Sequence, residues 1–209
     1  MKAFDIITEA DARTLEIGSS VALKPGGHVT PLAADTLKSR RITVLSSVAD
    51  AGLDGLAPVA DIKSIAIGSD HSGVALKAKL GDHLRQRGLN VLYVGTDGTD
   101  PVDYPDIAAQ VARLVARREV DAAIVIDGAG IGSAIAANKI AGARAAMCAD
   151  KTIARYSREH NGANVLALGA SLLAAGDAIA IVDTWIGTPM GEARYIRRLA
   201  KIRALEKTP

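Results

Sequence analysis

The sequence predicts an α/β protein whose main part is an open parallel sheet with helices on both faces, preceded by a small N-terminal appendage. From Ile65 onward, short apolar runs alternate with longer segments of helical periodicity, as in consecutive βαβ units. The apolar runs, such as "AAIVI", are continuous, as expected for strands that are covered on both faces. Of the 209 residues, 49% are hydrophobic and 3% aromatic, which favours close packing of helices on a sheet.

The elements of the main part follow from this alternation. Leu76, Leu80 and Leu84 fall on one face of a helical segment that Gly88 ends. Pro105 stands near the start of the next helix, where proline is favoured. Strands are expected at 65–68, 90–95, 122–126, 143–149 and 164–169. Helices are expected at 74–88, 104–120, 131–140, 151–161, 174–187 and about 190–207.

The first sixty residues follow a different pattern. "ITEADARTLEI" predicts a helix in which Thr8 is the N-cap and Asp11 completes a capping box. A strand, a Pro-Gly-Gly turn, a helix beginning near Thr30 and a second strand are expected next, and "DAGLDGLAPVAD" is typical of a linker. We therefore divide the chain into an N-terminal extension of unknown role, 1–60, and a main domain, 61–209. The extension is small for an independent core.

Composition excludes several classes of function. The net charge is +2 and no basic stripe is interleaved with aromatic residues, so no nucleic-acid partner is expected. No apolar run approaches the roughly 20 residues of a membrane span, and the acidic N-terminus does not resemble a signal peptide. We expect a cytoplasmic protein that does not bind membranes. The single cysteine, Cys148, excludes an intrachain disulfide and is expected to be buried as a small apolar residue.

Chemistry is expected where strands end, because open parallel sheets bind ligands at the carboxyl ends of their strands. Asp70 and His71 directly follow the strand at 65–68, although a capping turn would explain the aspartate equally well. Asp127 follows the strand at 122–126 and stands beside Gly128, Gly130 and Gly132.

The glycine-rich turn indicates an anion site. Its amides, at the start of a helix, can hold an anion or a developing oxyanion. The spacing lacks the Gly-Lys-Ser/Thr of a nucleotide-binding loop and the full dinucleotide fingerprint, which argues against a dehydrogenase. The turn is therefore expected to hold a small anionic ligand or an anionic reaction intermediate.

Two further pairs are candidates. His160 and Asn161 fall at the end of a helix, where a histidine is often structural. Arg194 and Arg198 lie four residues apart on one helix face and can together hold a phosphate, although a solvated face is the plainer interpretation.

Together these segments resemble a known family. "GSDHSGVALK", "DYPDIAAQVA", "GIGSAIAANKIAGARAAMCAD", "ARYSREHNGANVLALG" and the C-terminal arginine helix are similar to ribose-5-phosphate isomerase B and the galactose-6-phosphate isomerase subunits, over about 65–206. The resemblance implies a Rossmann-like fold and a homodimer or homotetramer with shared active sites. It also implies interconversion of an aldose phosphate and a ketose phosphate of four to six carbons, without metal or cofactor.

The resemblance also assigns roles to residues. Asp127 stands where the family usually has a cysteine, so it would be the base that moves a proton between neighbouring carbons. His160 would assist ring opening. The other roles are sugar contacts for Asp70 and His71, a hydroxyl contact for Asn161, phosphate binding for Arg194 and Arg198, and stabilisation of a cis-enediolate by the amides from Gly128 through Gly130 and Ile131 to Gly132.

Several positions depart from the family pattern. Ser133 replaces the glutamate of another branch, Ala129 a threonine and Ser171 an arginine. The cysteine-to-aspartate change motivates an alternative, a non-catalytic sugar-phosphate-binding or partner subunit; the retained site residues argue against it. The extension faintly resembles N-terminal segments of some microcompartment-associated enzymes, which suggests a role in assembly or targeting.

Overall fold

The chain forms two compact units. The computed structural model describes residues 2–45, 56–190 and 193–206, and the side chains of 25, 26, 193 and 194 lie outside this description. The larger unit comprises Ile62–Arg158 and Ala163–Thr188. The smaller unit comprises Met1–Asp61, Glu159–Gly162 and Pro189–Pro209. This division differs from a single boundary after residue 60, because the last helix groups with the N-terminal residues.

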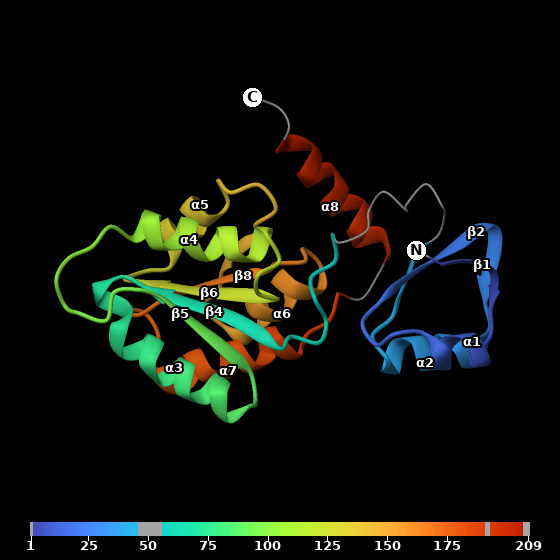
Figure 1. Cartoon of the computed structure of the whole chain (residues 1–209), viewed down its shortest axis with the longest axis horizontal. Helices are drawn as coiled ribbons and strands as arrows, with labels where there is room; N and C mark the ends of the chain where they lie inside the picture. The colour runs from blue at the N-terminus through green and yellow to red at the C-terminus, as the bar shows by residue number, and fades with distance from the viewer. Residues whose placement is uncertain (1, 46–55, 191–192, 207–209) are drawn as a thin grey trace. The chain divides into compact units, whose positions relative to one another are not determined.

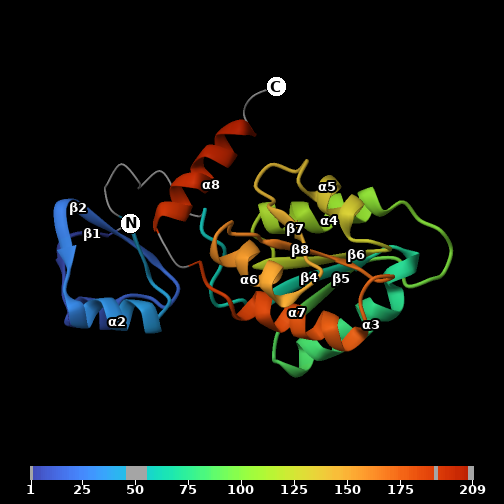
Figure 2. The same ribbon diagram turned by 180° about the vertical axis from the view of Figure 1, so that it is seen from behind.

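The larger unit contains a five-stranded, fully parallel sheet in the order β5-β4-β6-β8-β7, with helices on both faces, as predicted. Helices α4 and α5 cover one face, and α3, α6 and α7 cover the other (Figures 1 and 2). The strands are β4 (Ser64–Ser69), β5 (Asn90–Gly95), β6 (Ala122–Asp127), β7 (Ala145–Met147) and β8 (Val165–Gly169). The helices are α3 (Val74–Gln86), α4 (Tyr104–Ala116), α5 (Ile131–Ala137), α6 (Lys151–Glu159) and α7 (Ala175–Gly187).

Two apolar layers enclose this sheet because side chains alternate across each strand. In β4, Ile65 and Ile67 pack towards α3 and α7, whereas Ala66 packs towards α4 and α5. In β6, Ile124 and Val125 divide between the same two layers. Burial on both faces explains why the strands are continuous apolar runs.

The smaller unit is built on a three-stranded parallel sheet in the order β1-β2-β3. The expected capping box is confirmed: the Thr8 side chain accepts from the Asp11 amide, and the Asp11 carboxylate accepts from the Thr8 amide. The second helix begins at Pro31, as expected, and the Thr30 side chain caps it. The elements are β1 (Ala3–Ile7), α1 (Glu9–Thr14), β2 (Ser20–Val29), α2 (Pro31–Ser39), β3 (Thr43–Leu45) and α8 (Ala193–Leu205).

Two features of the extension differ from the prediction. Strand β1 was not predicted, and the Pro-Gly-Gly segment lies inside β2 as an irregularity: the register with β1 moves from Phe4–Leu23 to Ile6–His28. Gly27 is required there, because a Cβ atom would lie 2.7 Å from the Asp5 carbonyl oxygen. The predicted linker falls partly outside the described residues, and its described end begins with a buried residue, Leu56.

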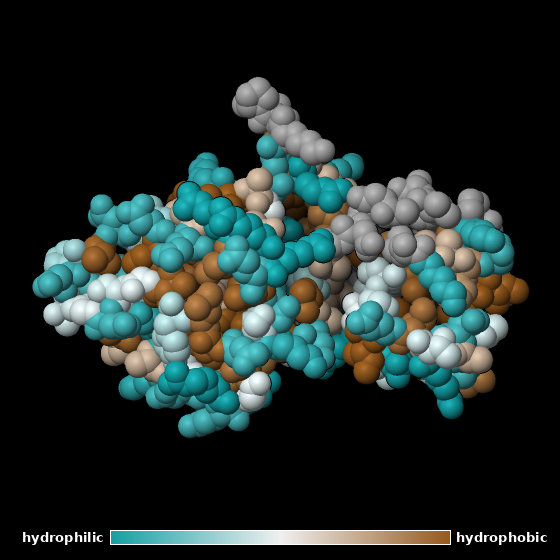
Figure 3. All heavy atoms as spheres, viewed as in Figure 1, coloured by the Kyte–Doolittle hydropathy of each residue, from teal (hydrophilic) through white to brown (hydrophobic). Residues whose placement is uncertain are grey.

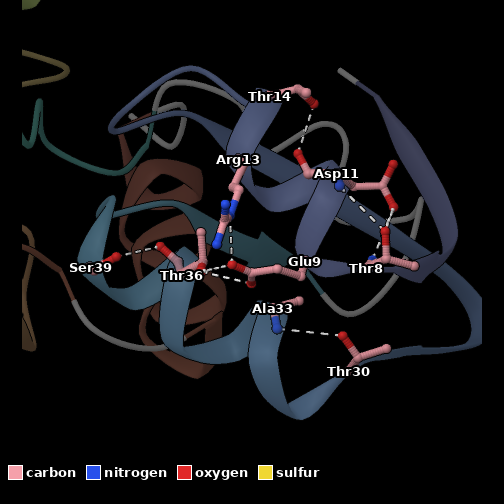
Figure 4. A network of polar contacts seen from close by, with 9 residues as sticks. All are labelled: Thr8, Glu9, Asp11, Arg13, Thr14, Thr30, Ala33, Thr36 and Ser39. Carbon is pink, nitrogen blue, oxygen red and sulfur yellow. Dashed lines mark hydrogen bonds and ion pairs between the residues drawn. The ribbon is translucent and has the colours of Figure 1, made fainter.

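A polar network joins the two N-terminal helices (Figure 4). The Thr36 hydroxyl donates to the Glu9 carboxylate at 2.7 and 2.8 Å, and the Arg13 Nε donates to it at 2.9 Å. These hydrogen bonds hold the pKa of Glu9 below its usual value, and the bond from Thr36 has the larger effect. Among the described residues, no helix is long and apolar enough to cross a membrane.

Candidate active site

The site is built where two neighbouring strands of the larger unit end. Strands β4 and β6 are neighbours, but the helices that follow them, α3 and α5, lie on opposite faces of the sheet. Open α/β sheets bind ligands at such a switch point. Ser69 pairs with Ile126, and the Asp70 amide donates to the Ile126 carbonyl at 3.1 Å. Asp70 and Asp127 therefore stand side by side, on backbones about 5 Å apart. Both are buried.

Asp70 starts the turn that leads into α3, as its capping interpretation predicted. Its Oδ1 accepts from the Ser72 amide at 2.9 Å, the Ser72 hydroxyl at 2.6 Å and the Gly73 amide at 3.2 Å. No described residue hydrogen-bonds its Oδ2. That oxygen is therefore available to accept a hydrogen bond from a ligand hydroxyl.

Asp127 is held by the glycine-rich turn that follows it. Its Oδ1 accepts from the amides of Ala129, at 2.8 Å, and Gly130, and its Oδ2 accepts from the Ser133 amide at 2.9 Å. The expected oxyanion site is thus corrected in part, because the Ala129 and Gly130 amides are occupied by the protein's own carboxylate. The Ile131 and Gly132 amides lie in the first turn of α5, where helix geometry leaves N–H groups without an intrahelical acceptor, and can still hold an oxyanion.

Close packing explains two glycines of this turn. Gly130 has φ +78°, and a Cβ atom on it would lie 2.9 Å from the Leu168 carbonyl carbon. A Cβ atom on Gly132 would lie 2.5 Å from the ring of Tyr104, at the start of α4. Tyr104 was not predicted as a site residue. Its only signal in the sequence was its place in the motif "DYPDIAAQVA".

Two serine hydroxyls flank the turn at Gly128. A Cβ atom on Gly128 would lie 3.8 Å from the Ser171 Oγ and 3.9 Å from the Ser72 Oγ. The Ser171 amide also donates to the Gly128 carbonyl at 3.0 Å. The turn after β8 therefore presents a neutral hydroxyl here, at the position where the sequence departs from an arginine.

The loop between β5 and α4 holds His71. The Val102 amide donates to the His71 Nδ1 at 3.3 Å, which leaves Nε2 as the donor of the neutral ring. The buried ammonium of Lys77 donates to the Thr96 carbonyl at 2.6 Å and to the Asp97 carboxylate at 2.8 Å, and so ties α3 to the start of this loop.

The remaining predicted residues lie in the smaller unit. The rings of His160 and Tyr195 lie 4.8 Å apart between centroids, at 32°. The Arg198 guanidinium lies 5.6 Å from the Tyr195 ring centroid. Tyr195 thus lies close to both predicted residues, a role that sequence reasoning missed. Arg194 belongs to the first turn of α8, and its side chain lies outside the description.

The predicted residues therefore fall into two groups, one in each compact unit. Asp70, His71 and Asp127 belong to the larger unit together with the glycine-rich turn, whereas the histidine, the asparagine and the two arginines belong to the smaller one. Segment Glu159–Gly162, which carries His160 and Asn161, is the only insertion of smaller-unit residues within the span of the larger unit.

A buried arginine anchors the base of that segment. Arg158 is fully buried, lies 4.7 Å from the Trp185 ring centroid and donates to the Ala163 carbonyl at 2.8 Å. Burial, and secondarily Arg144, lowers the pKa of Arg158 to about 10, so it stays charged at neutral pH.

Cys148 has the buried role that was expected. Its side chain is in the apolar layer beside α7, and burial raises the pKa of its thiol to about 11. No group of three or more His, Cys, Asp or Glu side chains in the described part of the chain is placed to hold a metal ion.

Comparison with known proteins gives a consistent result. Residues 65–202 match the family described as Ribose/Galactose Isomerase. The chain is 44% identical to ribose-5-phosphate isomerase B of Escherichia coli K12 over 146 residues, which are 70% of this chain and 98% of that protein.

Solved structures agree. Ribose-5-phosphate isomerase B of Clostridium thermocellum is 47% identical, with a TM-score of 0.68 over 69% of this chain and 97% of that one. The enzyme of Mycoplasma genitalium with bound ribulose-5-phosphate is 36% identical, with a TM-score of 0.68 over 70% of this chain and 97% of that one. The expected fold and family are confirmed: the chain belongs to the ribose/galactose isomerase family.

Proposed function

We propose that this protein is an aldose–ketose isomerase that acts on a sugar phosphate of four to six carbons. The observation that carries the proposal is the pair of buried aspartates at the switch point, beside the open amides of the first turn of α5. The bound ribulose-5-phosphate of the Mycoplasma genitalium relative supports a pentose phosphate as the first substrate to test.

In the proposed reaction, Asp127 removes the proton from the carbon next to the carbonyl group of the open-chain sugar. The electron pair of the broken C–H bond forms the C=C bond of a cis-enediolate, and the negative charge moves to oxygen. The proton then returns to the former carbonyl carbon, while the hydroxyl proton of the other carbon passes to the charged oxygen, so that this other carbon becomes the new carbonyl group. Among the described residues, the Ser133 amide alone donates to Asp127 Oδ2, so one lone pair of this oxygen can accept the proton of the substrate.

The neighbouring groups would then have complementary roles. The Ile131 and Gly132 amides face developing oxygen charge, as preorganised donors that lower the barrier. Oδ2 of Asp70 accepts from a sugar hydroxyl, and Nε2 of His71 donates to one. We assign ring opening to His160 and phosphate binding to Arg194 and Arg198, as the family resemblance implies.

We also propose a homodimer or homotetramer with shared active sites. Apolar residues reach the surface between hydrophilic ones on the face seen in Figure 3. Beside the glycine-rich turn, Ile131, Ile135 and Leu172 are 55%, 59% and 60% exposed. Apolar residues gathered at one place mark an interaction surface.

Microcompartment association stays a prediction about the extension.

The second candidate is a non-catalytic sugar-phosphate-binding subunit, favoured by the capping bonds that engage both oxygens of Asp127. Incubation with a panel of aldose phosphates, ribose 5-phosphate first, separates the two. Ketose formation that needs no added metal or cofactor supports the isomerase. Binding of these sugars without ketose formation, across the whole panel, would leave the binding subunit as the function.

A further inference from the structure

The sheet of the N-terminal extension is covered on both of its faces. Successive residues of a strand point to opposite faces. Val21 and Val44 pack with the layer under α1 and α2. Their neighbours Ala22 and Leu45 instead pack with residues of α8. Helix α8 is therefore the second cover of a three-layer unit.

The side of α8 that meets this sheet is apolar. Tyr195, Ile196 and Leu199 are 6%, 2% and 1% exposed and share one cluster with Leu45. Arg198 is exposed, on the helix side that is left to solvent. Burial against the sheet thus fixes how α8 is rotated about its axis, and with it the direction in which its arginines point.

The segment that carries His160 packs on the same helix. Gly162 has φ +56°, and a Cβ atom on it would lie 2.7 Å from the Leu199 Cδ1 and 3.3 Å from Pro58 in the extension. The neighbouring rings of His160 and Tyr195, tilted by 32°, add a second contact. The histidine, the arginine helix and the extension therefore form one packed body.

We propose that the N-terminal extension is a positioning element of the active site, which holds α8 so that Tyr195 places His160 and Arg198 for the phosphorylated substrate. The inference rests on the proposed function. The family match begins at residue 65, so the extension lies outside it. In this chain, α8 thereby depends on residues that the matched region lacks.

Two leucine variants test the proposal. Leu45→Ala removes a buried side chain, 2% exposed, from the α8 side of the sheet. Leu37→Ala is the matched control: it is equally buried, at 3%, but lies on the α1/α2 side. We expect Leu45→Ala to raise the KM for the sugar phosphate and the Kd for inorganic phosphate by about 10- to 100-fold, because small displacements of binding groups are costly. Leu37→Ala should change both by less than about 2-fold.

A second pair keeps the test independent of the stability of the extension. Tyr195→Phe keeps the ring and should retain phosphate affinity, whereas Tyr195→Ala should weaken it about as much as Leu45→Ala does. Inorganic phosphate binding is measured by calorimetry on the full chain, with folding checked by circular dichroism, so it reports on the inference even if no sugar is isomerised. Equal phosphate affinities in the folded wild type, Leu45→Ala and Tyr195→Ala proteins would overturn the proposal. So would equal losses in the Leu45 and Leu37 variants.

Discussion

Replacing Asp127 with asparagine should separate its two roles, that of a base and that of a cap. An amide keeps one acceptor oxygen, which can still receive the Ala129 and Gly130 amides. Its NH2 group then faces the Ser133 amide, which in the wild-type protein donates to Oδ2 at 2.9 Å. One charge-assisted hydrogen bond is lost and one N–H group is left unpaired.

Two magnitudes follow from this change. The lost hydrogen bond should lower the free energy of unfolding by about 1.5–3 kcal/mol. Loss of a general base should slow proton transfer by about 100- to 10,000-fold, which corresponds to about 2.7–5.5 kcal/mol of barrier. Because folded proteins are stable by about 5–15 kcal/mol, the variant should remain folded while its chemistry is nearly abolished.

Asp70→Asn is the matched control. Its hydrogen bonds with the described part of the chain are all on Oδ1, so an amide can keep that oxygen and turn its NH2 group to the position of Oδ2. It should cost about 1 kcal/mol of stability and act mainly on KM.

The assay follows deuterium entering the substrate carbon from D2O by NMR, beside urea denaturation of each variant. Near wild-type exchange in Asp127→Asn would remove Asp127 from proton transfer and leave it as a cap. A larger loss in Asp70→Asn would transfer the role of the base to Asp70.

Four further expectations concern other parts of the chain. Arg198→Ala should weaken substrate binding about 10- to 150-fold by removing a charge-assisted contact to phosphate, and unphosphorylated sugar should be unaffected. Light scattering at micromolar concentration should show a dimer or tetramer, and an active monomer would contradict a shared site containing His160. Because burial raises the pKa of the Cys148 thiol to about 11, iodoacetamide at about pH 8 should label it only after denaturant unfolds the protein. Because the pKa of Glu9 is lowered in the folded state, its ionised carboxylate stabilises the fold above the usual carboxylate pKa, and this stability is lost as pH falls through the lowered value. Thr36→Val removes the main cause of the shift, so its loss in free energy of unfolding, measured by urea denaturation, should become smaller below about pH 4.3.

The position of the site could be predicted from the sequence because it depends on local patterns. An apolar run that ends in Asp127 and opens into glycines specifies a strand, a turn and a helix start in that order. The parallel arrangement then brings Asp70 to the neighbouring strand end. Which oxygen bonds which amide could not be predicted, because it depends on the turn's backbone, including the positive φ of Gly130.

The packing of α8 on the N-terminal sheet could not be predicted from the sequence, for a different reason. The spacing of Tyr195, Ile196 and Leu199 indicates an apolar helix face, but a periodic pattern does not name its partner. That partner, Leu45 with its neighbours, lies near the opposite end of the chain. Strand β1 was missed because "AFDII" is short and a charged residue interrupts it.

The three-layer arrangement of the smaller unit also sets an order of events during synthesis. Leu199, which covers Leu45, is made 154 residues after it, since 199 − 45 = 154. At about 5–20 residues per second, one face of the newly made sheet stays uncovered for roughly 8–30 s, during which all strands of the larger unit are made. The nascent chain therefore exposes this apolar face until α8 has left the ribosome, and only then can the sheet reach its final packing.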